Sequence, residues 1–176
     1  SAASDVYKRQ LCSFAIAPGK ASEVISPEFK EAGHAIRLVS CDPHDTAALT
    51  ANYDAVLSAI RAGKVVSAWA LGLGGVAEGL FKMGIGNQTG TRIDDDYDGN
   101  LFAQQIGAML LECTEDIDLG VKVGDTVPEW VLEYEGERID LTAMQEIYEG
   151  KLDKVFSYRG HTGETTEKFS YSAETY

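Results

Sequence analysis

The chain has 176 residues, the size of one ordinary domain, and 44% of them are hydrophobic, so we expect a substantial buried core. It carries 28 acidic and 15 basic residues, a formal net charge of -13, which argues against a nucleic-acid duplex as partner because phosphate binding needs a basic face. No apolar segment is long enough to predict a membrane-spanning helix. Three widely spaced cysteines predict reduced thiols of a cytoplasmic protein rather than a disulfide framework.

The first part of the chain predicts strands separated by turns and short helices. Residues 1–10 show no periodicity and are interpreted as a non-native leader. Residues 11–17 form the first candidate strand. The order Ser26-Pro27-Glu28 is typical of a short helix start, and Gly33 would end that helix. A second strand is predicted over residues 35–40.

The rest of the chain continues this alternation and then becomes richer in strands. A longer helix is predicted to begin at Asp45 or Thr46 and to end at Gly63. Residues 158–176 are polar and rich in glycine, serine and threonine, which indicates a linker. The remaining predictions are strands over 65–71, 106–111, 121–127 and 130–139 and a last helix over 141–148. Together they predict an α+β domain in which helices are layered on a mixed sheet.

A glycine turn between a predicted strand and a predicted helix is the main candidate binding site. Gly72, Gly74 and Gly75 separate the apolar run 65–71 from a segment with helical spacing. They leave the main chain uncovered, and the amide groups and dipole of the following helix favour a nucleotide or phosphate there. The glycines could instead form a tight packing turn. Asn87 could bind the same ligand or cap its own turn.

An acidic loop is a second candidate site. Asp94, Asp96 and Asp98 alternate before Gly99, as in the opening of a calcium-binding loop. Gln105 stands where such a loop needs a bidentate Glu. The competing interpretation is an acidic, solvated connection between two buried segments.

Several motifs, taken in order, resemble the second C-terminal-type domain of a large single-chain phosphoribosylformylglycinamidine synthase. This domain belongs to the aminoimidazole ribonucleotide synthetase superfamily, and its C-terminal-domain fold is the one that we expect. The similarity covers residues 11–157, and residues 158–176 resemble the connector that precedes a glutaminase domain. The motifs are residues 25–33, 63–68, 72–78, 82–87, 101–103 and 106–108.

The resemblance implies a fragment of an ATP-dependent amidotransferase of purine biosynthesis. In such enzymes ATP phosphorylates an amide oxygen of formylglycinamide ribonucleotide, and ammonia from glutamine displaces it. ATP, Mg²⁺, the small-molecule substrate and the other domains of the same polypeptide, a glutaminase domain included, are the implied cofactors and partners.

The sequence departs from this family at the glycine turn. Many relatives carry His-Asp-x-Ser-Asp-Gly-Gly where this chain has residues 69–75, Trp-Ala-Leu-Gly-Leu-Gly-Gly. The glycines are present and the carboxylates and hydroxyl are not, so we expect no catalytic residue here but a scaffold or one wall of a nucleotide site. The alternatives are an acidic Ca²⁺-binding module and a structural spacer domain without its own ligand.

Overall fold

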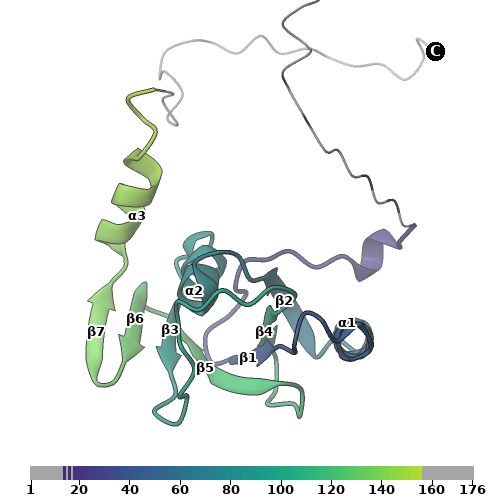
Figure 1. The fold of residues 1–176 in the computed structure, drawn as a ribbon. Coiled ribbons are helices and arrows are strands. Elements are labelled where there is room, and N and C mark those ends of the chain that lie inside the picture. The colour runs from purple at the N-terminus through teal and green to yellow at the C-terminus, as the bar shows by residue number, and fades with distance from the viewer. Residues whose placement is uncertain (1–13, 15, 17, 156–176) are drawn as a thin grey trace, which may run out of the picture.

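The computed structural model describes residues 14, 16 and 18–155. In that part of the chain a seven-stranded sheet has the order β2-β4-β1-β5-β3-β6-β7 and is accompanied by three α-helices (Figure 1). This confirms the predicted α+β class with a mixed sheet. The strands are β1 (Ala35–Val39), β2 (Val65–Ala70), β3 (Gly90–Ile93), β4 (Met109–Cys113), β5 (Val121–Val127), β6 (Val131–Tyr134) and β7 (Glu137–Asp140). The helices are α1 (Thr46–Arg61), α2 (Gly75–Ile85), α3 (Thr142–Gly150) and the short 3-10 helix η2 (Ala21–Glu23).

The two faces of the sheet are covered by different helices. Neighbouring strands are antiparallel except β3 and β6, which are parallel. Side chains of α2 form one core with Ile36 and Leu38 of β1, and Val56 of α1 belongs to the opposite core with Ala35 and Val39. Alternate residues of a strand face opposite sides of a sheet, so β1 contributes to both cores. The nearly continuous apolar run of β4 is likewise buried on both faces.

The structure confirms the predicted start and end of α1. The carboxylate of Asp45 accepts a hydrogen bond from the Ala48 amide at 3.0 Å, which satisfies one of the free donors of the first turn. After the last turn the backbone of Gly63 has a positive φ of 71°, a conformation that glycine adopts without strain. The last predicted helix is confirmed as α3.

The helix predicted to begin at Ser26 and to end at Gly33 is wrong. This segment is extended and bent, because its backbone groups bond to distant parts of the chain. The Phe29 amide donates to the Met83 carbonyl at 2.8 Å, and the Lys30 amide donates to a buried carboxylate of β4. These tertiary hydrogen bonds replace the bonds that a helix would make within the segment.

Three further differences concern strands. The prediction of one strand over 130–139 is wrong, because β6 and β7 form a hairpin that turns at residues 135–136. The strand predicted over 106–111 lies later in the chain, at β4, and β3 was not predicted. The predicted strand over 11–17 lies mostly outside the described residues, and the leader 1–10 and the linker 158–176 lie wholly outside them.

Within the described residues, no helix combines the length and the apolar character needed to cross a membrane.

Candidate functional site

The glycine turn lies where β2 ends and α2 begins, as predicted. Gly74 is the N-cap of α2 and has no side chain to cap the helix. The first amides of the helix nevertheless have acceptors within the chain. The Gly75 amide donates to the Gly72 carbonyl, and the Ala77 amide donates to the Leu101 carbonyl at 2.9 Å. Most donors that would hold a phosphate therefore already have partners.

The carboxylate of Glu78 occupies the space above the turn. Its Oε2 accepts a hydrogen bond from the Gly74 amide at 2.8 Å, and its Oε1 accepts one from Lys82 Nζ at 2.6 Å. A methyl group added at Gly72 would lie 2.9 Å from Oε2, and one added at Gly74 would lie 2.6 Å from the Glu78 Cβ. Both glycines thus leave room for this side chain, which serves as the anion at the helix start.

Charge at the turn is balanced by the ion pair on α2. The hydrogen bond from Lys82 and then the bond from the Gly74 amide lower the pKa of the Glu78 carboxyl. The same pair raises the pKa of Lys82, whose Nζ lies 5.5 Å from the ring centre of Trp69. Both side chains are partly exposed, 28% each, so both charged groups are in contact with solvent. An incoming anion would have to displace the Glu78 carboxylate before it could reach the helix start.

Gly75 is needed for a different reason from Gly72 and Gly74. Its φ is 64°, and the backbone of residues 101–103 crosses directly over it. A methyl group there would lie 2.6 Å from the Ala103 carbonyl oxygen and 2.8 Å from the Leu101 carbonyl oxygen. The glycine therefore combines a left-handed conformation with close packing of two backbone segments.

Two large apolar side chains are exposed beside the turn. Leu73, within the turn, is 80% exposed, and Phe102, in the segment that crosses Gly75, is 74% exposed. Apolar side chains of this size gather at surfaces that meet a ligand or another protein segment. The turn thus presents an apolar rim around a helix start that is already occupied by a carboxylate. Sequence reasoning did not identify this rim, because neither residue belongs to a recognisable motif.

Asn87 does not lie with the glycines. It follows the C-terminal end of α2, whereas the glycines precede its N-terminal end, and an 11-residue helix is about 16 Å long. Its side-chain amide donates to the Phe29 carbonyl at 2.7 Å, which holds the extended segment before β1. The structure therefore places the four predicted residues at two ends of one helix.

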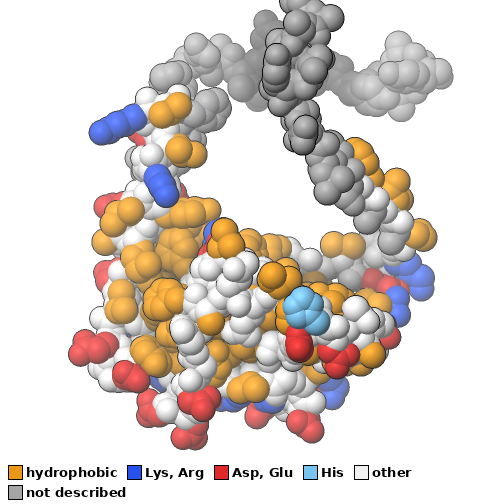
Figure 2. Space-filling view, viewed as in Figure 1, with side chains coloured by type: hydrophobic (Ala, Val, Ile, Leu, Met, Phe, Trp, Pro, Cys, Tyr) orange, Lys and Arg blue, Asp and Glu red, His pale blue; other side chains and the backbone are white. Residues whose placement is uncertain are grey.

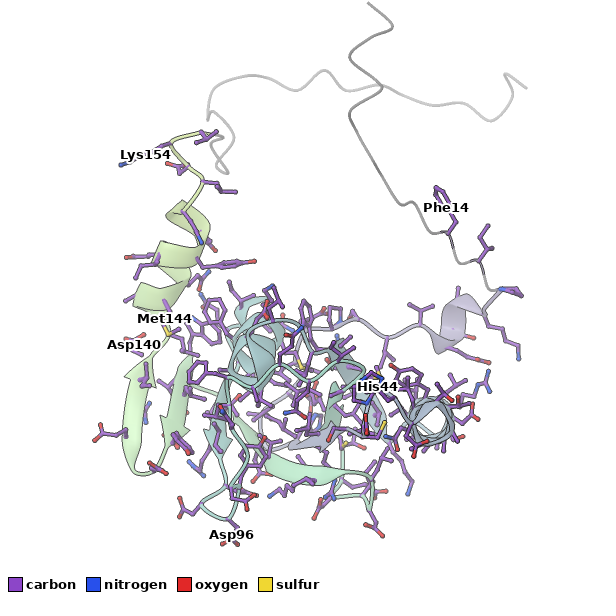
Figure 3. The ribbon with its side chains drawn as sticks, in the orientation of Figure 1. Phe14, His44, Asp96, Asp140, Met144 and Lys154 are labelled. Atoms are coloured by element: carbon purple, nitrogen blue, oxygen red, sulfur yellow. The ribbon has the colours of Figure 1, made fainter. Side chains whose placement is uncertain are left out.

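The acidic loop joins β3 to the segment that leads to β4. Asp94 pairs with Lys122 at 3.1 Å, and Asp96 and Asp98 are exposed. Figure 3 shows Asp96 at the tip of the loop, directed into solvent, and Figure 2 shows acidic side chains gathered along this edge of the molecule. Among residues 14, 16 and 18–155, no group of three or more His, Cys, Asp or Glu side chains is placed to hold a metal ion. Calcium binding by this loop stays a prediction.

Sequence reasoning also missed a buried carboxylate on β4. Glu112 has no exposed surface, and its oxygens accept hydrogen bonds from the amides of Lys30 and Glu31 and contact His34 Nδ1 at 2.7 Å. A charge within an apolar strand was the only signal in the sequence that could have indicated it. This carboxylate holds the extended segment 26–34 against the sheet, which is a structural role.

Solved structures share the fold of this chain. No family model and no curated protein matches the sequence. Among solved structures, T. maritima PurL complexed with FGAR has a TM-score of 0.58 and 13% identity, over 70% of this chain and 30% of that chain. PurL complexed with AMPPCP gives 0.58 and 16%, over 69% and 27%. Phosphoribosylformylglycinamidine synthase II from Thermotoga maritima gives 0.54 and 14%, over 85% and 30%.

This chain spans less than a third of the length of these solved structures. At identities this low, the likeness concerns the backbone fold rather than the residues of a site. The mixed sheet with its helices therefore has the fold of a part of phosphoribosylformylglycinamidine synthase, as the sequence resemblance predicts.

Proposed function

We propose that this chain is a fragment of an ATP-dependent amidotransferase of purine biosynthesis, the enzyme that converts formylglycinamide ribonucleotide to its amidine with ammonia from glutamine. The observation that carries the proposal is the shared fold with PurL structures that were solved with FGAR, ATP and AMPPCP. The ordered motifs between residues 25 and 108 support it independently. The substrate, the nucleotide and the glutaminase partner are parts of this proposal.

Within that enzyme we assign this chain the role of a scaffold that supplies one wall of a nucleotide site. The apolar rim formed by Leu73 and Phe102 suits a flat, partly apolar ligand or an adjoining domain. Glu78 already provides the anion at the start of α2. The chain therefore offers a packing surface at this turn, and phosphate charge would be neutralised elsewhere in the enzyme.

Magnesium does not fit the residues of this turn. Mg²⁺ takes oxygen ligands from one or two carboxylates and from phosphates, and the single carboxylate at the turn, Glu78, is paired with Lys82 at 2.6 Å. The proposal therefore assigns no magnesium ligand to this turn. What the chain does is fix the position of the turn by packing Gly75 beneath residues 101–103.

The test uses the complete polypeptide that contains this chain. Glutamine-dependent formation of ADP in the presence of formylglycinamide ribonucleotide measures turnover, and calorimetry measures the affinity for AMPPCP. The variant Gly74→Leu places a side chain where the Glu78 Cβ lies, so it should lower turnover at least tenfold. The matched control is Gly150→Leu, because nothing lies within 4 Å of a methyl group there.

The two readouts separate the parts of the proposal. Loss of AMPPCP affinity with an unchanged circular dichroism spectrum supports a nucleotide-site wall, and loss of turnover alone supports a scaffold. Unchanged affinity and turnover in Gly74→Leu would contradict both roles. Absence of any substrate-dependent ADP formation by the wild-type polypeptide would contradict the amidotransferase assignment itself.

A further inference from the structure

The two edges of the sheet differ in their chemistry. In the part of the chain that the structure describes, β2 pairs only with β4 and β7 only with β6, so these two strands form the edges (Figure 1). All of β7 is exposed, and it carries the charged residues Glu137, Arg138 and Asp140. β2 has no charged residue. Charged side chains on an edge strand keep other strands from pairing with it, so β2 is the edge that stays open to a further strand.

An apolar groove, which we call the α1 groove, runs beside the β2 edge. Tyr53 and Leu57 of α1 line it and are 43% and 38% exposed. The opposite face of β2 is covered, because the buried Ser67 hydroxyl donates to the Pro27 carbonyl at 2.7 Å. An open edge next to an apolar groove is typical of a surface that pairs with a strand of another molecule. The α1 groove is lined by Tyr53, Val56, Leu57, Ile60, Ala70 and Met109.

α1 carries opposite charges at its two ends. Asp42 and Asp45 lie exposed at its start, and Arg61 and Lys64 lie at its end. Each of the two basic residues pairs with a glutamate of the same chain, yet their side chains are 56% and 51% exposed. α1 runs opposite to β2, because the short segment 62–64 connects them and the two elements pack together. The charges are therefore separated along the direction of the open edge.

We propose that the β2 edge and the α1 groove bind the same surface of a second copy of this chain, with the two β2 strands antiparallel across a two-fold axis. An axis perpendicular to the sheet joins the two sheets into one and keeps both α1 helices on the same face. Tyr53 and Leu57 of each copy then cover the groove of the other. The rotation also sets the acidic start of one α1 against the basic end of the other, so the patch is complementary to itself.

Sedimentation equilibrium of the chain of residues 1–176 measures this association. The net charge of -13 on each copy opposes it, so the measurement uses about 0.15 M salt, which screens that repulsion. Over concentrations from about 1 to 200 μM, the mass should rise toward twice the 19.0 kDa of one chain. A monomer at every concentration would overturn the proposal. Species that grow beyond the dimer would also overturn it, because a two-fold interface closes.

An exchange of charges tests the contact between the helix ends. Lys64→Glu should raise the Kd of the dimer about tenfold, because the affected pair occurs twice in a two-fold dimer. Combining it with Asp42→Lys restores opposite charges and the wild-type net charge, so most of the loss should be recovered. The control Lys154→Glu changes the net charge equally but lies beyond α3, away from β2 (Figure 3), and should leave Kd unchanged. Equal weakening by Lys64→Glu and Lys154→Glu, or no recovery in the double variant, would overturn the proposal.

Hydrogen exchange tests the pairing of the strands. Amides of β2 should exchange about tenfold more slowly at the highest concentration than at the lowest, because those on the open edge gain acceptors. Leu57→Asp should remove this difference, since it places a charge in the α1 groove. The control Ile147→Asp alters a residue of α3 that is 73% exposed and should retain the difference. Protection that appears in β7 or α3 in place of β2 would assign the contact to another surface and overturn the proposal.

Discussion

Gly75 gives the sharpest test of how the glycine turn is built. In Gly75→Ala the new methyl group would lie 2.6 Å and 2.8 Å from the carbonyl oxygens of Ala103 and Leu101. Two costs add. A side chain at a φ of 64° costs roughly 1–2 kcal/mol, and moving the crossing backbone aside costs about 1–3 kcal/mol more. We therefore expect a loss of about 2–5 kcal/mol in the free energy of unfolding.

Gly136→Ala separates these two costs. Gly136 has a φ of 79°, and nothing lies within 4 Å of a methyl group built there, so only the conformational cost applies, about 1–2 kcal/mol. Urea titration of both variants, followed by circular dichroism, measures the difference in unfolding free energy. A larger loss for Gly75→Ala is the expected result. Equal losses would refute the inference that the backbone of residues 101–103 needs a glycine beneath it.

Three other variants test the rest of the structure. Glu112→Ala should lower the free energy of unfolding by about 3–5 kcal/mol, because two backbone amides and a histidine ring lose their buried acceptor. Urea titration measures this loss, and a loss below about 1 kcal/mol would contradict the role of Glu112. In a variant whose other two cysteines are changed to serine, Cys113 should not react with a thiol reagent at pH 8 until urea unfolds the chain. The reason is that burial raises the pKa of the Cys113 thiol to about 11. Reaction of the folded protein would contradict this burial. Hydrogen bonds from Lys30 and Ser26 lower the pKa of Glu28 from 4.5 to about 2. The difference in stability between wild type and Glu28→Gln should therefore be fully present above pH 4.5 and be lost as the pH falls toward 2. A pH-independent difference would contradict that pairing.

Local patterns predicted those elements whose signals are also local. Asp45 caps α1 as expected, and the change from an apolar run to helical spacing located the end of β2 and the start of α2. The segment from Ser26 to Gly33 has equally good local signals for a helix, but its amides bond to Met83 and to a carboxylate of β4. Those acceptors are more than 50 residues away in sequence, so no local pattern could reveal them.

The candidate site was predictable in position but not in its contents. The glycine cluster marked the turn correctly. The position of the Glu78 carboxylate over Gly72 and Gly74 depends on the rotamer and on the partner Lys82, which a sequence does not show. The approach of residues 101–103 to Gly75 depends on tertiary packing. A turn that binds an anion and a turn whose helix start is occupied by the chain's own carboxylate therefore have the same sequence pattern.

Sequencing the parent gene in both directions from this segment tests the central proposal most directly. The amidotransferase assignment predicts one open reading frame that continues upstream into a related pair of synthetase domains and downstream into a glutaminase domain with a nucleophilic cysteine. A start codon near Leu11 and a stop codon directly after Tyr176 would contradict it.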